Sequence, residues 1–177
     1  ICMAAFVLSV TLNMFLFTYP LDWNALGLEP SELWKIYAIV FLPSLLLVFP
    51  YVRFSEKRGD LRTPTRVGWF FITGGFLVYL FGGLNAKVLY LAGAGFFFGY
   101  SLFQPILPSL MTQRVSIEKR GTALGFYNVA RFFGAALGGI VAGTLAHWHR
   151  LGPAALALTI LLAWLWVGFA DRAELTS

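Results

Sequence analysis

The sequence predicts an all-α membrane protein, a bundle of six transmembrane helices. Hydrophobic residues make up 59% of the 177 residues and charged residues only 12%, whereas about 25% of a soluble domain is charged. The charges gather in short segments between apolar runs, and each run approaches the roughly 20 residues that cross about 30 Å of hydrocarbon. A soluble fold is excluded because so few charged side chains could not cover the apolar surface.

The apolar runs define six predicted helices within one domain, residues 1–177. A short turn at Asn85–Lys87, supported by the preceding Gly82 and Gly83, separates the third helix from the fourth. The first run lacks a basic leader and a cleavage site, so we do not interpret it as a signal peptide. The chain starts at Ile1 rather than Met, and we expect it to belong to a longer polypeptide. The predicted helices cover residues of about 2–20, 35–52, 67–84, 88–112, 121–146 and 153–170.

The distribution of Lys and Arg predicts that both ends of the chain are cytoplasmic. The segments 53–66, 113–120 and the C-terminal tail carry nine basic residues and fall on one side of a six-helix topology. The other side carries only Lys35, Lys87 and Arg150. Because basic residues favour the cytoplasmic side, the nine fix the orientation. Their position at helix ends also argues against a nucleic-acid partner.

Acidic residues are predicted to lie outside the membrane helices, in loops, at helix ends or in the tail. Proton-coupled transporters usually keep an ionisable group in the membrane. If this protein is coupled to protons, the sequence predicts that the carboxylate comes from another part of the polypeptide.

Arg131 is the one charged residue placed deep in a predicted helix. It lies about ten residues into the fifth helix, which corresponds to a depth of roughly 15 Å. Burial of Arg at such a depth costs at least about 2.5–3.5 kcal/mol, so the side chain should face protein or water. Two interpretations stay open: a structural Arg bonded to carbonyls or an amide, or an Arg that binds an anionic group. Asn128, three residues earlier on the same face, would share its environment.

Other polar residues within the predicted helices are weaker candidates for a cavity lining. Tyr100 and Gln104 stand one turn apart, and Pro105 predicts a kink directly after them. Asn13 in the first helix would either bond a neighbouring helix or face a ligand. His147 and His149 have a poor spacing for a metal site on a helix. We therefore expect no cofactor, no metal and no catalytic residue.

Glycine rows predict close helix contacts. Gly134 with Gly138, and Gly139 with Gly143, form two GxxxG pairs in the fifth helix, and Gly95 with Gly99 forms a third in the fourth helix. Such rows let two helix backbones approach closely in a membrane. The pattern fits static packing and a sliding interface between moving bundles equally well.

Three segments resemble motifs of major facilitator superfamily drug/proton antiporters. Residues 108–125 resemble the junction between spans 10 and 11. Residues 130–139 resemble the antiporter motif gxxxGPxxGG, with Ala130 in place of its first Gly and Ala135 in place of its Pro. Residues 55–59 resemble the cytoplasmic D-R-x-G-R loop; Glu56, Lys57 and Gly59 match it in kind, and Asp60 departs from it. Residues 32–37 are similar to the YajR-like branch.

This resemblance covers essentially the whole chain and implies the C-terminal half of a major facilitator transporter, spans 7 to 12. It implies spans 7, 8, 10 and 11 near a central cavity and an N-terminal six-helix half as partner. The implied localisation is the bacterial inner membrane. The implied activity is secondary transport of a small organic compound, with proton-coupled efflux as one form.

Two other classes of membrane protein are alternatives. An intramembrane protease would need a Ser nucleophile in a Gly-x-Ser-Gly-type setting and a facing His, but Leu102 and Phe103 follow Ser101, so we expect no enzyme. A non-transporting membrane scaffold, or a six-span protein that associates with itself, would use the glycine rows equally well. Solute movement by reconstituted protein distinguishes these from a transporter.

Overall fold

The computed structural model describes residues 1–59, 62–148, 152, 157 and 161, and these residues contain helices and no strand. Two 3₁₀ turns, Pro30–Glu32 and Ile117–Lys119, precede the second and the fifth α-helix. The α-helices are α1 (Cys2–Ala25), α2 (Leu33–Lys57), α3 (Arg62–Phe81), α4 (Ala86–Gln113) and α5 (Arg120–Trp148).

The structure confirms the first five predicted helices. The sixth, residues 153–170, lies almost entirely outside the described residues. Within the described part, four segments are long and apolar enough to cross a membrane, and they contain α1, α2, α4 and α5. The 20 residues of α3 would measure about 30 Å at 1.5 Å per residue. The predicted turn between α3 and α4 is confirmed, and Gly83 adopts a φ of +74° there.

Hydropathy placed several helix ends wrongly. The segment 53–66 was predicted as a loop, but α2 runs to Lys57 and α3 starts at Arg62. Glu56 and Lys57 therefore lie in the last helical turn, and Gly59 follows them with a φ of +70°, a conformation that favours glycine. Hydropathy detects only the apolar part of a helix, whereas the hydrogen-bonded backbone continues past it.

The prediction that no membrane helix contains an acidic residue was also wrong. α1 extends to Ala25 and so includes Asp22, which is only 1% exposed. Its neighbour Trp23 is 4% exposed. The predicted helix ends at Pro20, but α1 passes through this proline. A buried carboxylate thus lies near the end of α1 at which α2 begins.

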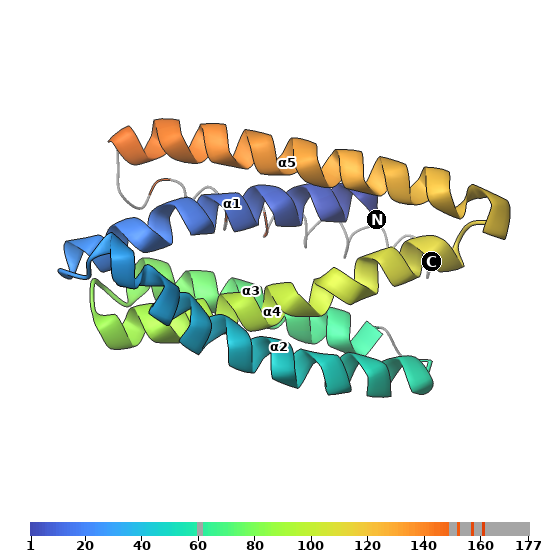
Figure 1. The fold of residues 1–177 in the computed structure, drawn as a ribbon, viewed down its shortest axis with the longest axis horizontal. Coiled ribbons are helices and arrows are strands. Elements are labelled where there is room, and N and C mark those ends of the chain that lie inside the picture. The colour runs from blue at the N-terminus through green and yellow to red at the C-terminus, as the bar shows by residue number, and fades with distance from the viewer. Residues whose placement is uncertain (60–61, 149–151, 153–156, 158–160, 162–177) are drawn as a thin grey trace, which may run out of the picture.

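Two closely packed helix pairs form the bundle (Figure 1). α5 runs along α1, α3 runs along α4, and α2 packs on α4. Contacts of α4 with α1 and α5 join the two pairs. The C-terminal ends of α1, α3 and α5 lie at the same end of the molecule, on the left in Figure 1.

An aromatic cluster fills the centre between α1, α3 and α4. The ring of Phe15 stacks on Phe96 with 4.1 Å between centroids and meets the edge of Phe76 at 5.6 Å. One turn later in α1, the hydroxyl of Tyr19 donates a hydrogen bond of 3.1 Å to the carbonyl of Leu89. Gly93 leaves room for that ring, because a Cβ there would collide with the Tyr19 hydroxyl.

Glycines set the distance between α3 and α4. A Cβ on Gly99 would lie 2.5 Å from the carbonyl oxygen of Gly68, and a Cβ on Gly75 would lie 2.7 Å from the backbone nitrogen of Phe96. The predicted close neighbour of Gly95 and Gly99 is therefore α3. In a membrane such backbone contact supplies packing energy that lipid-facing apolar side chains cannot.

This crossing yields a prediction with an internal control. Gly75→Ala should destabilise the bundle by roughly 1–3 kcal/mol, as overpacking does, because backbone atoms of α4 cannot yield. Gly74→Ala on the same helix should be neutral or stabilising, since no atom lies within 4 Å of a Cβ there. Thermal unfolding of the full polypeptide in detergent measures both. Equal melting temperatures for the two variants would contradict the packing described.

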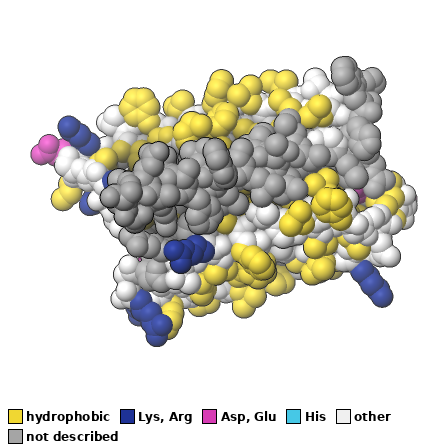
Figure 2. Space-filling model, turned by 180° about the vertical axis from the view of Figure 1, so that it is seen from behind, with side chains coloured by type: hydrophobic (Ala, Val, Ile, Leu, Met, Phe, Trp, Pro, Cys, Tyr) yellow, Lys and Arg dark blue, Asp and Glu magenta, His cyan; other side chains and the backbone are white. Residues whose placement is uncertain are grey.

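The outer surface is apolar, as a lipid-facing bundle requires. Phe70 on α3, Phe49 on α2 and Phe132 on α5 are 74%, 73% and 68% exposed. Hydrophobic side chains are spread over the face in Figure 2, and most Lys and Arg side chains in that view lie toward the two ends of the molecule. This pattern is that of an integral membrane protein.

Candidate polar site between three helices

A small pocket lies where α1, α4 and α5 meet, and it contains three of the five predicted cavity residues. These are Tyr100 and Gln104 on α4 and Arg131 on α5. The rest of its lining comes from Ala5, Leu8, Ser9, Phe103, Leu107 and Tyr127.

Arg131 lies beside two phenols. Its guanidinium hydrogen-bonds the side chain of Tyr127, one turn earlier on α5, and lies near Tyr100 on α4. Both phenols are buried, at 4% and 8% exposed. The guanidinium also lies 5.9 Å from the ring centroid of Phe132, at the limit of a cation–π contact. Arg131 is half-buried, and these aromatic side chains lie beside its guanidinium.

Gln104 lies at the edge of this group, exposed and hydrogen-bonded to Tyr100 one turn before it. α4 continues without a break through Pro105 and Pro108. Because Pro105 has no N–H, the carbonyl of Ser101 loses its partner within the helix. The Ser101 hydroxyl is also buried and hydrogen-bonds no other described residue.

The two predicted asparagines lie outside the pocket. The amide of Asn13 donates a hydrogen bond of 2.9 Å to the carbonyl of Ser9 on its own helix. Asn128 is exposed on α5. The structure therefore does not bring them together with Arg131 in this bundle.

Sequence reasoning missed Tyr127 and Ser9. Tyr127 stands four residues before Arg131, so the i, i+4 neighbour rule of helices could have identified it. Ser9 gave no comparable signal, because its place in the pocket depends on where α1 lies against α4 and α5. Among residues 1–59 and 62–148, no three His, Cys, Asp or Glu side chains gather as metal ligands would.

The two glycine rows of α5 have different surroundings. A Cβ on Gly134 would lie 2.5 Å from the carbonyl oxygen of Phe6, and one on Gly138 would lie 2.6 Å from that of Val10. This row forms the contact with α1. By contrast, Gly139 and Gly143 have no atom within 4 Å of a Cβ position, so their row faces open space in the described part.

Comparison with known proteins supports a transporter family. The family model described as Major Facilitator Superfamily matches residues 1–176. The inner membrane transport protein YajR of Escherichia coli is 27% identical over 121 residues, which cover 66% of this chain and 26% of that protein. Two multidrug resistance proteins MdtH are also similar. The one from Cronobacter sakazakii is 28% identical over 156 residues, which cover 82% of this chain and 39% of that protein.

The MdtH protein of Proteus mirabilis is 31% identical over 134 residues, which cover 75% of this chain and 32% of that protein. Each relative is thus matched over about a quarter to two fifths of its own length. The family match, by contrast, runs along nearly the whole of this chain. Together with the apolar helices, it shows that this chain belongs to the Major Facilitator Superfamily.

Proposed function

We propose that this chain is the C-terminal six-helix half of a secondary active transporter that moves a small organic solute by alternating access. The observation that carries the proposal is the cluster of Arg131, Tyr127 and Tyr100, which lies within membrane helices at the meeting of α1, α4 and α5. Major facilitator transporters place their substrate sites near the midplane between two six-helix halves.

The chemistry of the cluster suits an anionic or hydrogen-bond-accepting group on the solute. A guanidinium has five N–H donors in a fixed fork, and two phenols cannot occupy all of them. Gln104 lies exposed beside Tyr100 and adds an amide that both donates and accepts. An organic solute with one polar, acceptor-rich end would meet these groups, and its apolar remainder would contact Phe103 and Leu107.

The unpartnered face of α5 supports a second bundle as the partner. Phe126 and Val129 are 67% and 65% exposed, and the open glycines Gly139 and Gly143 lie further along the helix. We propose that the N-terminal half, in the same polypeptide, covers part of this face, and that Asn128 and Asn13 line the cavity only after assembly. The greater length of the relatives fits this arrangement. Both ends of this chain would be cytoplasmic, in a bacterial inner membrane.

Efflux driven by protons is the form of transport we propose, since two of the relatives are named multidrug resistance proteins. The test reconstitutes the full polypeptide in liposomes preloaded with a fluorescent cationic or anionic dye and imposes a pH gradient. We expect dye movement that stops when a protonophore collapses the gradient. Protein-free liposomes are the control. No movement of any dye in either direction would favour the scaffold interpretation.

A further inference from the structure

An apolar groove lies on the outside of the bundle, away from the polar site. It runs between α2 and α3, with α4 as its floor, and has a volume of about 540 Å³, within the roughly 300–1,000 Å³ of small-molecule sites. Among the described residues of its lining, Ser44 alone has a polar side chain. The lining consists of Ile39, Val40, Pro43, Ser44, Leu47, Phe70, Phe71, Gly74, Gly75, Val78, Leu91, Ala94, Gly95 and Phe98.

Glycine creates the hollow. At Gly74 no atom lies within 4 Å of a Cβ position, so the absence of a side chain leaves space there. At Gly75 the missing side chain instead lets α3 approach the backbone of Phe96 on α4. The helix α4 therefore forms the floor of the groove directly beside α3. From Ile39 to Leu47 the wall formed by α2 is about 12 Å long at 1.5 Å per residue.

One end of the groove is closed by apolar packing. Beyond Leu47 and Phe70, the next turns of α2 and α3 pack together on α4. Val48 and Val52 of α2 are buried there with Leu102 and Ile106 of α4, and Val67 of α3 packs against them.

The other end of the groove carries two lysines. Lys35 precedes Ile39 by four residues on α2, and Lys87 precedes Leu91 by four residues on α4. Residues four apart lie on the same helix face, so each lysine stands one turn beyond a groove residue. Both are exposed. An apolar groove that ends blind at one side and at two cations on the other matches an acyl chain with a negatively charged head.

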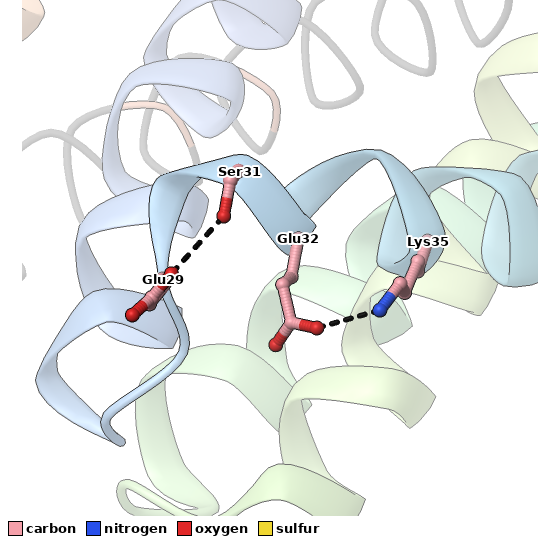
Figure 3. Close-up of polar contacts among 4 residues, drawn as sticks. All are labelled: Glu29, Ser31, Glu32 and Lys35. Carbon is pink, nitrogen blue, oxygen red and sulfur yellow. Dashed lines mark hydrogen bonds and ion pairs between the residues drawn. The ribbon is translucent and has the colours of Figure 1, made fainter.

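Of the two lysines, Lys87 is the more available to bind a phosphate. Within the described part of the chain, no acidic side chain forms an ion pair with it. Lys35 forms an ion pair with Glu32, three residues earlier, whereas Glu29 accepts a hydrogen bond from the hydroxyl of Ser31 (Figure 3). The side chains of Lys35 and Glu32 are 51% and 43% exposed, and an exposed pair of this kind contributes little stability. A phosphate can therefore displace Glu32 from Lys35.

We propose that this groove binds one anionic phospholipid, with an acyl chain between α2 and α3 and its phosphate at Lys87 and Lys35. The lipid belongs to the leaflet on the side where α2 and α4 begin. Transfer of an acyl chain from bilayer to groove gains no hydrophobic free energy, because lipid is already apolar. Selectivity therefore comes from the head group, with a preference of about fivefold for each lysine near the surface.

The test uses the full polypeptide in nanodiscs that contain phosphatidylglycerol with a photoreactive diazirine at the end of one acyl chain. Cross-linked residues are mapped by mass spectrometry. We expect cross-links at Phe70, at the closed end of the groove, at least about fivefold above Leu77, which is exposed on α3 but outside the groove. Equal yields, corrected for exposure, would show ordinary lipid contact and overturn the proposal.

Two variants separate the groove from the head group. Gly74→Leu should fill the hollow and reduce the cross-links at least about fivefold, while Leu77→Phe leaves them unchanged. Lys87→Gln should reduce them about fivefold with phosphatidylglycerol and not with phosphatidylcholine carrying the same diazirine. A photoreactive amino acid at Phe70 that captures residues 153–177 or a second copy instead of lipid would also overturn the proposal. None of these measurements depends on transport.

Discussion

Replacement of Arg131 by Ala is expected to abolish solute transport by the full polypeptide without reducing the amount of protein in the membrane. Among the described residues that line the polar pocket, Arg131 alone is charged, and it lies beside Tyr127 and Tyr100. A hydrogen bond to a charged group contributes about 1.5–3 kcal/mol. Loss of a single one would thus slow transport by roughly 10- to 150-fold, and loss of several would remove it.

The alternative interpretation, a purely structural Arg, makes a different prediction. If Arg131 only joins α5 to α4, then Arg131→Ala lowers the melting temperature, and the transport rate per folded molecule stays at the wild-type value. Arg131→Lys keeps the charge but loses the planar fork of donors. We expect it to fold normally and to show a raised KM for anionic solutes, a result that a structural role would not produce.

Tyr127→Phe provides the matched control at the same site. It removes one hydroxyl that bonds the guanidinium and keeps the buried ring. We expect a loss of transport smaller than that of Arg131→Ala, on the order of a single hydrogen bond of about 1 kcal/mol. Transport kinetics unchanged in Arg131→Ala itself would refute the proposed role of this residue.

The fold could be predicted from the sequence where a single strong physical rule applied. Long apolar runs predicted the first five helices, because a membrane span must be both long and apolar. The rule does not define where a helix ends. α1 passes through Pro20 and carries the buried Asp22, since a helical backbone continues for as long as its hydrogen bonds find partners.

The site was predicted in part for a similar reason. The cost of burying a charge singled out Arg131 once its apolar run had been predicted to form the fifth helix. Its partner Tyr100 and the pocket residue Ser9 depend on how far α4 and α1 are shifted along α5, and no local pattern encodes such a shift. That Asn128 and Asn13 line a cavity remains a prediction, which concerns the assembly with the proposed N-terminal half.

The glycine rows of α5 show the same limit and lead to the second large effect we expect. The two rows start at Gly134 and Gly139, five residues apart, which corresponds to about 140° around the helix. They therefore cannot face the same neighbour. The sequence contains two equivalent GxxxG pairs, and only the position of α1 decides which of them it contacts.

Gly134→Ala and Gly138→Ala are each expected to destabilise the bundle by roughly 1–3 kcal/mol. In both cases the new methyl group would meet a backbone carbonyl of α1, at 2.5 and 2.6 Å, and a backbone atom has no other rotamer to adopt. Gly139→Ala and Gly143→Ala have free space, so they should instead gain roughly 0.5–1 kcal/mol from the higher helix propensity of Ala. Thermal unfolding of the four variants in detergent gives the comparison.

Larger residues in the open row test what covers it. Gly139→Leu and Gly143→Leu should leave folding intact, because no described residue is near enough to obstruct them. If the N-terminal half packs or slides against this face, the same two variants should stop transport while the protein remains stable and inserted. Normal transport in both would mean that lipid covers the row, and the second bundle would have to meet the exposed aromatic residues of α5 elsewhere. Loss of transport without loss of stability would identify the row as part of the moving interface, because a static lipid-facing surface accepts added apolar bulk.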